Sequence, residues 1–183
     1  MKNLKPALKL ITVFYLFIAV LPGCSLRKNN RVFTAVLSDE VAERALAYAL
    51  DKVGCPYVWG GQGPDEFDCS GLVIWAYTEA YPRLKLLNQN QEVVYDVTAD
   101  ELWRYNVLHI LPGEMRKGDL VFITNTTEKI THAGLFIRWI DEDTFEFVNA
   151  SSVFMEVAVD TWPLQGIKRE QWFAGAGRMK TVL

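Results

Sequence analysis

The sequence predicts an α+β domain in which helices come first and an antiparallel sheet follows. Apolar residues recur at helical spacing through residues 41–53, which indicates an amphipathic helix. From Lys117 onward the spacing changes to that of short strands separated by turns. The chain of 183 residues, 50% of them hydrophobic, has no internal repeat and no shift in composition that would mark a second domain. We therefore expect one packed core.

The N-terminus has the pattern of a secretory signal. Three lysines precede an apolar run over residues 10–21, which is too short for a comfortable membrane span. The next residues, Pro22-Gly23-Cys24, resemble the lipobox of bacterial lipoproteins, which are cleaved before the cysteine and acylated on it. Pro22 departs from the residue usual in that motif, so secretion without a lipid and a retained anchor are the alternatives.

We therefore divide the chain into three parts. They are a signal peptide over residues 1–23, lipidated Cys24 with a polar tether over residues 24–37, and a domain over residues 38–183. Cleavage before Cys24 removes three lysines and no acid, which takes the formal charge from −3 to −6. An acidic protein is a poor candidate for nucleic-acid binding, because the phosphate backbone requires a basic face. A membrane, reached through the lipid on Cys24, is the expected partner.

Two cysteines, Cys55 and Cys69, remain in the domain. An exported protein can join them in a disulfide, but the surroundings of Cys69 suit a free thiol better. Cys55 is interpreted as a small buried apolar residue. No cluster of cysteine and histidine has the spacing of metal ligands, so neither a metal nor a cofactor is expected.

The first helix is bounded by clear signals at both ends. Ser38 is a suitable N-cap, and Gly54 follows the last apolar position, Val53. The chain then runs through a short extended segment, residues 55–61, that ends in a glycine turn.

The second helix begins at Cys69, with Asp68 as its N-cap, and ends before Pro82. A cysteine in the first turn lies among N–H groups that have no intrahelical partner, at the positive end of the helix macrodipole. Both features favour an anion. The position therefore predicts a lowered pKa for Cys69 and a role as nucleophile.

The pattern is weaker between this helix and the first strand. Thr98 and Glu101 have the spacing of a capping box and predict a short helix. Residues 84–97 fit either a loop or a lip of an active-site cleft. His109 lies in an irregular apolar stretch and is interpreted as a surface or packed histidine.

A five- or six-stranded antiparallel sheet is expected from the second half of the chain. The expected strands are residues 119–124, 132–139, 145–149, 153–159 and 172–178, with a surface loop over residues 166–171.

A cysteine nucleophile needs a base and a group that orients the base. His132 opens the second expected strand, Asp141-Glu142-Asp143 is the expected turn after it, and one possibility is a two-residue turn of Asp141-Glu142. That turn would set His132 opposite Ser151 and place Asn149 diagonally beside it on the same face. The amide oxygen of Asn149 would then hold one imidazole nitrogen and leave the other for the thiol. A turn one residue longer would put the two side chains on opposite faces.

Four motifs follow one another along the chain. They are Pro56-Tyr57-x-Trp59-Gly60-Gly61, Phe67-Asp68-Cys69-Ser70-Gly71, Lys117-Gly118-Asp119-Leu120-Val121-Phe122 and His132-Ala133-Gly134. Together they resemble the NlpC-type cell-wall peptidases, which are papain-like cysteine peptidases of bacteria. The resemblance covers about residues 39–178. It implies a papain-like domain with the cysteine helix packed on the sheet, and hydrolysis of peptidoglycan stem peptides, commonly between D-glutamate and the diamino acid.

The resemblance also implies catalytic roles. It makes Cys69 the nucleophile and His132 the general base and later the acid. Asn149 takes the place of the third polar residue, which is more often histidine in the family. An amide orients the imidazole without adding charge, so a thiolate–imidazolium pair is less favoured than with histidine.

Further residues match positions around the family's substrate. Tyr57 resembles a tyrosine that assists the oxyanion site, and Asp68 and Ser70 match positions that hold the free amine of the substrate. The simpler alternatives are a packed aromatic at Tyr57, a helix cap at Asp68 and a local hydrogen bond at Ser70. Trp59 and Trp75 are expected in the core, and the motif glycines are expected to serve tight turns and close packing.

The sequence thus predicts a monomeric, lipid-anchored peptidoglycan endopeptidase of the bacterial envelope. Ser25, after Cys24, is compatible with sorting to an outer membrane. One alternative is a catalytically silent domain that binds wall fragments or a partner protein. Another is a cysteine amidase or acyltransferase of related fold. Acyltransferases of related fold often place histidine before cysteine, so the order here favours the peptidase.

Overall fold

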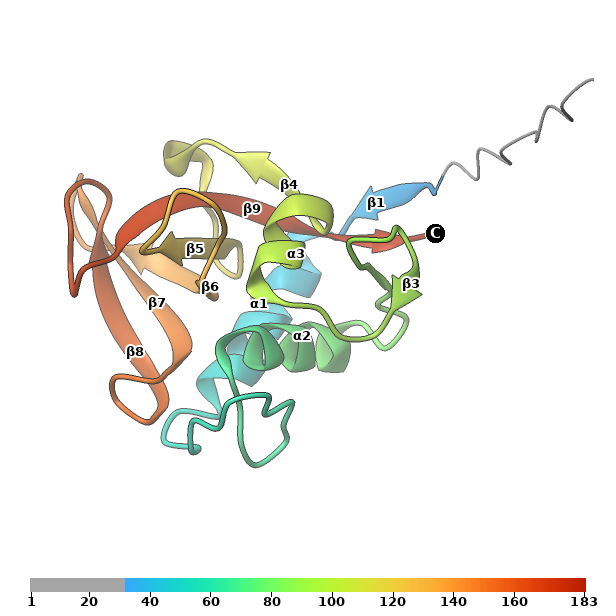
Figure 1. The fold of residues 1–183 in the computed structure, drawn as a ribbon, viewed down its shortest axis with the longest axis horizontal. Coiled ribbons are helices and arrows are strands. Elements are labelled where there is room, and N and C mark those ends of the chain that lie inside the picture. The colour runs from blue at the N-terminus through green and yellow to red at the C-terminus, as the bar shows by residue number, and fades with distance from the viewer. Residues whose placement is uncertain (1–31) are drawn as a thin grey trace, which may run out of the picture. The chain divides into compact units, whose positions relative to one another are not determined.

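The computed structural model describes residues 32–183. The predicted signal peptide (1–23), Cys24 and most of the predicted tether lie outside the described residues. The described part has the predicted α+β architecture, with helices α1 and α2 beside an antiparallel sheet (Figure 1). Its elements, in chain order, are β1 (Thr34–Val36), α1 (Asp39–Leu50), α2 (Cys69–Ala80), β2 (Leu86–Leu87), β3 (Val93–Val94), α3 (Ala99–Tyr105), β4 (Val107–Ile110), the 3-10 helix η1 (Pro112–Glu114), β5 (Leu120–Thr124), β6 (His132–Trp139), β7 (Thr144–Ser151), β8 (Glu156–Pro163) and β9 (Trp172–Val182).

Seven of the described strands form one sheet in the order β1-β9-β5-β6-β7-β8, with β4 also paired to β9. Five or six strands are predicted, and the two that the sequence does not reveal are β1 and β4. The first lies inside the predicted tether, and the second contains His109, where an irregular stretch is predicted. Both are short and pair only with β9, so neither carries the buried alternation that identifies a strand.

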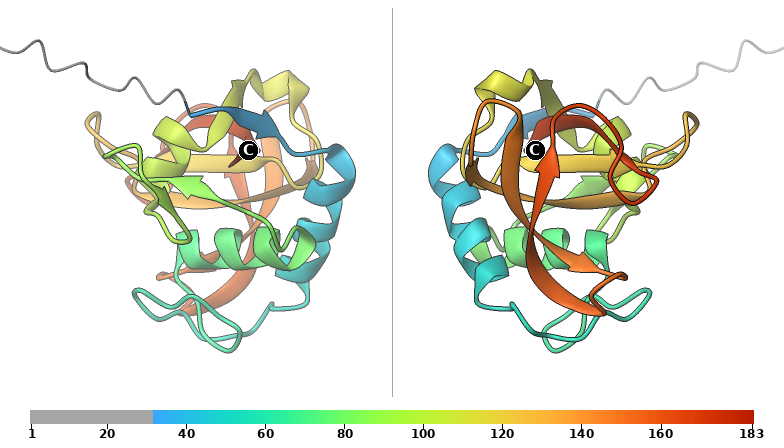
Figure 2. Two further views of the ribbon diagram at one scale, coloured as in Figure 1. Left: turned by 90° about the vertical axis from the view of Figure 1, so that its right-hand side faces the viewer. Right: turned by 90° about the vertical axis from the view of Figure 1, so that its left-hand side faces the viewer.

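The first helix follows its prediction closely. The Ser38 hydroxyl accepts a hydrogen bond from the Val41 N–H at 3.4 Å, and the helix ends at Leu50, one turn before Gly54. Its buried face meets α2 and the strands β6 and β7, and the two views of Figure 2 show α1 and α2 crossing beside the sheet. At Gly118 a side chain would lie 2.1 Å from the Ala42 carbonyl oxygen, so glycine is what lets α1 approach the start of β5.

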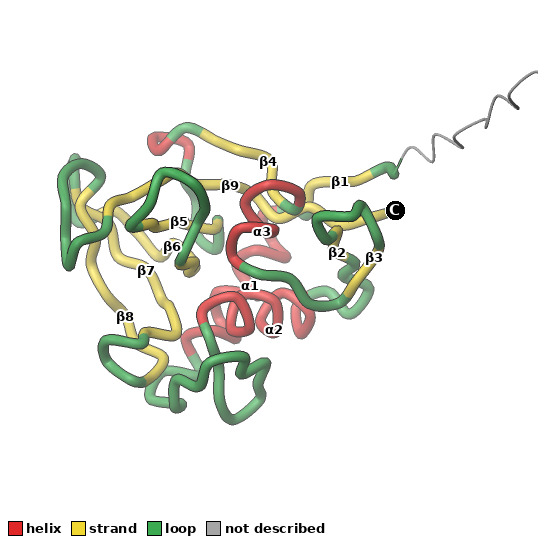
Figure 3. The backbone as a smooth tube through the Cα atoms, in the orientation of Figure 1, coloured by secondary structure: helices red, strands yellow, loops and turns green. Residues whose placement is uncertain are grey.

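The segment between α2 and α3, where loop and lip remain open in the sequence, contains a small β-hairpin. Strands β2 and β3 pair there and form a separate two-stranded sheet (Figure 3). The predicted capping box then starts α3. The Glu101 N–H donates to the Thr98 hydroxyl at 3.2 Å, and the Thr98 N–H donates to the Glu101 carboxylate at 3.0 Å.

The β6–β7 hairpin reaches the predicted register by a different route. Its turn consists of the expected residues 141–143 and is longer than the two-residue possibility, because Trp139 pairs with Phe145 and the Ile140 N–H bonds to the Thr144 carbonyl. A bulge between Phe136 and Arg138 shifts the pairing back by one residue. From Leu135 toward His132 the strands therefore have the register that the shorter turn would give.

The last two strands differ from their predictions at their ends. Strand β8 begins at Glu156 instead of Val153, because residues 152–155 form the turn after β7. Strand β9 continues to Val182, where it pairs with β1. The predicted surface loop over residues 166–171 lies between β8 and β9. Among residues 32–183 no helix is both long and apolar enough to cross a bilayer.

Candidate active site

Cys69 is the first residue of α2, as predicted, and Asp68 is the N-cap. The Asp68 Oδ1 atom accepts a hydrogen bond from the Gly71 N–H at 2.7 Å and one from the Ser70 hydroxyl at 3.1 Å. Its Oδ2 atom accepts from the Gly60 N–H at 3.0 Å. One carboxylate therefore fixes both the start of the cysteine helix and the glycine turn in front of it.

The same turn lies directly against the helix. A side chain on Gly71 would come within 2.0 Å of the Gly61 carbonyl oxygen. That carbonyl also accepts the Asp68 N–H at 2.8 Å. The glycines at 60, 61 and 71 thus have the structural roles that the sequence suggests, and they bring the segment that carries Tyr57 beside Cys69.

The Cys69 sulfur lies near the backbone N–H groups of Ala133, at the start of β6, of Ser70 and of Cys69 itself. These hydrogen-bond donors act to lower the pKa of the thiol. Burial and the charge of Asp68 act in the opposite direction and prevail, raising the pKa of Cys69 to about 11. The lowered pKa predicted from the helix position is therefore wrong. The resting group is a thiol, because the N-cap that orients the helix also places a negative charge beside the sulfur.

His132 and Asn149 are joined by a hydrogen bond of 3.0 Å between the imidazole Nε2 and the amide Oδ1. The amide is oriented from behind, because its Nδ2 donates to the Ala158 carbonyl at 3.3 Å. An oxygen that can only accept faces Nε2, so the neutral imidazole carries its proton on Nε2 and leaves Nδ1 free to accept another. Asn149 is 2% exposed, which keeps water away from this bond.

Burial lowers the pKa of His132, and this effect outweighs the hydrogen bond to Asn149 and the charges of Asp160 and Asp68, which raise it. With the Cys69 pKa raised and the His132 pKa lowered, both groups are neutral at pH 7. The arrangement suits a histidine that takes a proton from the thiol during attack rather than a preformed ion pair.

Tyr57 lies close to the sulfur. Burial raises the pKa of its phenol, and the negative charge that Cys69 carries once it ionises and the charge of Asp68 raise it further. The hydroxyl therefore keeps its proton at neutral pH and can donate a hydrogen bond. A protonated phenol can donate a hydrogen bond to a developing oxyanion.

Two cavities meet at Cys69. The larger, about 830 Å³, is bounded by Ser70, Asp68 and the start of α3. The smaller, about 120 Å³, is bounded by His132 and Asn149 together with residues of β8 and of the loop before β9. Cys69, Trp59 and Thr131 border both cavities, so the thiol lies at their junction.

Trp59 is 88% exposed at this junction, so its predicted place in the core is wrong. The glycine turn that follows it holds the backbone against α2 and leaves the indole outside. Trp75 is partly buried and packs edge-on against Phe67 at a centroid distance of 5.3 Å, in agreement with its prediction. Cys55 packs against the core and, like Cys69, is a free thiol.

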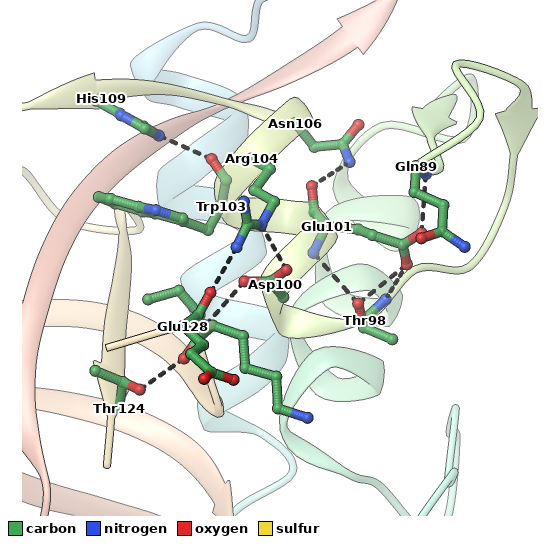
Figure 4. A network of polar contacts seen from close by, with 12 residues as sticks. Gln89, Thr98, Asp100, Glu101, Trp103, Arg104, Asn106, His109, Thr124 and Glu128 are labelled. Carbon is green, nitrogen blue, oxygen red and sulfur yellow. Dashed lines mark hydrogen bonds and ion pairs between the residues drawn. The ribbon is translucent and has the colours of Figure 1, made fainter. Parts of the chain in front are cut away.

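The far wall of the larger cavity is held by a polar network around α3 (Figure 4). Arg104 Nε pairs with the Asp100 carboxylate at 2.6 Å and its Nη2 donates to the Glu128 carbonyl at 2.7 Å. Asp100 in turn accepts the Ile130 N–H at 2.9 Å. These contacts tie the loop before β6, and with it the approach to His132, to the helix.

His109 takes no part in either cavity. Its Nε2 lies 2.8 Å from the Trp103 carbonyl oxygen, and its ring stacks on the Trp103 indole at 3.9 Å, as a surface histidine packed against a neighbour. Two residues that sequence reasoning does not single out, Asp160 and Arg169, do border the smaller cavity. Neither belongs to a motif, and their contact joins separate segments.

Comparison with known proteins gives consistent similarities. A sequence model described as the NlpC/P60 family matches residues 54–174. The probable endopeptidase YafL of Escherichia coli (strain K12) is 33% identical over 116 residues, which are 62% of this chain and 43% of the relative. The bifunctional muramidase/DL-endopeptidase CwlT of Bacillus subtilis (strain 168) is 35% identical over 98 residues, which are 52% of this chain and 26% of the relative. The chain thus spans less than half the length of these two relatives.

A solved structure of NlpC2 from Trichomonas vaginalis has the same fold. It superposes with a TM-score of 0.56 at 26% identity, over 80% of this chain and 50% of that chain.

Proposed function

Since this chain belongs to the NlpC/P60 family and carries a cysteine peptidase domain of that family, we propose that it hydrolyses the amide bond between D-glutamate and the diamino acid of peptidoglycan stem peptides. The family supports peptidoglycan as the substrate class, and a relative described as a DL-endopeptidase supports this choice of bond. The observation that best supports this proposal is the His132–Asn149 hydrogen bond at the edge of a cavity that also reaches Cys69.

Attack begins from the neutral pair. As the Cys69 sulfur approaches the carbonyl carbon of the scissile amide, Nδ1 of His132 takes the thiol proton. Asn149 keeps the imidazole in the required tautomer and orientation. The raised pKa of Cys69 makes this proton transfer essential, because little thiolate exists at neutral pH without it.

The tetrahedral intermediate places a negative charge on the former carbonyl oxygen. The Cys69 N–H at the start of α2 and the Tyr57 hydroxyl are the donors proposed to meet it. The His132 imidazolium then gives its proton to the leaving amine, and the C–N bond breaks. Water attacks the thioester with His132 again as base, which releases the D-glutamyl carboxylate and restores the thiol.

The position of His132, the proposed acid, indicates which part of the substrate occupies each cavity. His132 borders the smaller cavity and is absent from the residues that bound the larger one. The leaving amine, which must receive the proton of His132, therefore departs into the smaller cavity. The acyl part of the stem peptide occupies the larger cavity, where Asp68 and Ser70 are proposed to hold its free amine.

Location follows from the N-terminal pattern. We propose that the chain is cleaved before Cys24, lipidated there and held at the bacterial envelope, in the outer membrane if the host has one. The lipobox-like residues support this, and cell-wall hydrolase relatives fit an envelope or secreted protein. The alternative of a silent wall-binding domain is an outcome of the experiment below.

The test is digestion of purified peptidoglycan by the full chain in detergent beside Cys69→Ala, with the products identified by mass spectrometry. New fragments from the wild type alone, ending in D-glutamate on one side and starting with the diamino acid on the other, are expected. If both proteins leave the peptidoglycan uncut while circular dichroism shows both folded, the hydrolase proposal fails for this substrate. Retention of both proteins on the same peptidoglycan would then favour the silent binding domain.

A further inference from the structure

The loop between β8 and β9 contains a turn with an unfavourable backbone. Lys168 and Gln171 exchange two backbone hydrogen bonds, at 2.8 and 3.0 Å, around Arg169 and Glu170. These two central residues have φ angles of +53° and +61°. Both angles are positive in this type of tight turn, which is normally built from asparagine and glycine. Two ordinary side chains at these positions cost stability unless surrounding contacts hold them.

A buried carboxylate supplies those contacts. Asp160 on β8 is 9% exposed and pairs with Arg169 Nη1 at 2.6 Å and with Lys168 Nζ at 3.1 Å. Burial acts to raise the pKa of Asp160, but the interactions with Arg169 and Lys168 outweigh it and lower the pKa, so the carboxylate is ionised at any pH near neutral. The guanidinium also lies 4.9 Å from the centre of the Phe154 ring, in the turn between β7 and β8. Arg169 is thus fixed between the sheet and a neighbouring turn.

The position of Arg169 bears directly on the site. Arg169 and Asp160 border the smaller cavity together with Cys69 and His132. Two cations share the Asp160 carboxylate, with Lys168 on one of its oxygens and Arg169 on the other. Within residues 32–183 the only side-chain hydrogen bond of Arg169 is made by Nη1, and 32% of its side chain is exposed. Its Nε and Nη2 donors therefore remain available at the cavity rim.

From this geometry we infer that Arg169 determines specificity on the leaving-group side by binding a carboxylate of the residue released into the smaller cavity. The assignment rests on the proposed function, because the departing amine defines that side. An amino acid that leaves through its α-amine carries a carboxyl group two bonds away from that nitrogen, and a diamino dicarboxylic acid carries a second one. A planar guanidinium with two free donors matches a carboxylate in a forked geometry.

The test compares two synthetic peptides that differ only in the leaving group. One is L-alanyl-γ-D-glutamyl-meso-diaminopimelate, and in the other the diaminopimelate carboxylates are primary amides. The wild type is expected to cleave the acid with a kcat/KM about 10- to 100-fold above that of the amide, as for a hydrogen bond between charged groups. Arg169→Gln is expected to lose this preference through a higher KM for the acid, with the amide changed less than about twofold. Arg169→Lys, which keeps the charge without the fork, is expected to fall between them.

Lys168→Gln is the matched control. Lys168 shares the turn and the Asp160 carboxylate with Arg169, yet it does not border the cavity. It should keep the preference for the acid even if the turn loosens. Equal cleavage of both peptides by the wild type, or an equal loss on both in Arg169→Gln, would overturn the assignment.

The two proposals fail separately. If neither peptide is cleaved, the proposed function is refuted, and calorimetry with free diaminopimelate and its diamide on Cys69→Ala decides the binding assignment. Tighter binding of the acid than of the diamide, lost when Arg169→Gln is added, would support a carboxylate site. Equal binding of diaminopimelate and its diamide would refute the carboxylate site.

Discussion

The two cavities that meet at Cys69 are bounded by different kinds of structure. The larger cavity is walled by helix starts and loops. Its carboxylates, Asp68, Asp100 and Glu101, are held by helix caps and a bond from the Ile130 N–H, and the cations Arg104 and Lys129 line it as well. The smaller cavity is walled by strands and two turns. Its charged residues are Arg169 and Asp160, which pair with each other across nine residues of chain, from the turn before β9 to strand β8.

The contrast suggests a division of labour. On the acyl side Asp68 borders the region where the amine of the substrate is proposed to bind, while on the leaving side Arg169 is proposed to bind the released acid. The proposed chemistry lies between the two, since His132 and Asn149 border the smaller cavity and Cys69 borders both.

The largest expected effect is that of His132→Ala. The neutral thiol of Cys69 needs a base, and the leaving amine needs an acid, so we expect kcat to fall by about 10³-fold or more. A thioester or nitrophenyl ester substrate, whose leaving group needs no proton, should recover part of this loss. Stopped-flow measurement of acylation with both substrate types checks the prediction. Equal losses on both types would contradict the assignment of His132 to the leaving side.

The pH dependence of thiol reactivity is the second test. Because burial and the Asp68 charge raise the pKa of Cys69 to about 11, alkylation by iodoacetamide should accelerate about tenfold per pH unit from pH 7 to pH 9. A preformed ion pair with His132 would instead give a rate that is already high and flat near pH 6. Mass spectrometric counting of modified Cys69, with Cys55 as the internal reference, distinguishes the two profiles.

The same pKa shift has a consequence for stability. The folded-state pKa of Cys69 lies above that of the unfolded thiol, so the folded state holds a proton that the unfolded state loses as pH rises. The contribution is therefore complete below about pH 9, the usual range of a thiol, and is lost as pH rises toward 11.

The sequence predicts best what is local. The N-cap of α2 and the capping box of α3 each depend on residues three positions apart, and both form as expected. The motif order also identifies the family, because it fixes which helix precedes which strand. The predicted contact between His132 and Asn149 forms, but for a reason that the sequence does not reveal. The longer turn and the bulge each shift the strand register by one residue, and the two shifts cancel.

The errors concern features that depend on the assembled surroundings. The Cys69 pKa is misjudged because the macrodipole can be read from a helix start, whereas burial against β6 cannot. Trp59 looks like a core residue by type, yet nothing in the described part of the chain covers it. Arg169 is missed because its turn lacks glycine and its partner, Asp160, sits on another strand.

The smallest effect is expected for Asp68→Asn. This variant distinguishes the roles of the two cavities most directly. The carboxylate accepts from the Gly71 N–H with one oxygen and from the Gly60 N–H with the other, and an amide can serve only one of them. Asparagine is itself a good N-cap, so the loss of stability should be about 1 kcal/mol. Loss of the charge should raise KM about five- to tenfold for peptides with a free N-terminal amine and leave N-acetylated peptides almost unchanged.

Two further readouts keep this prediction apart from a merely structural change. Removing the negative charge lowers the pKa of Cys69, so alkylation at pH 7 should become faster while cleavage of the amine substrate becomes weaker. The double variant Asp68→Asn with Arg169→Gln should show the sum of the two single effects in log kcat/KM, because the residues border separate cavities on opposite sides of the thiol. Strong non-additivity would mean that the acyl and leaving sides act as one site. Slower alkylation in Asp68→Asn would mean that the cap, rather than the charge, governs the cysteine.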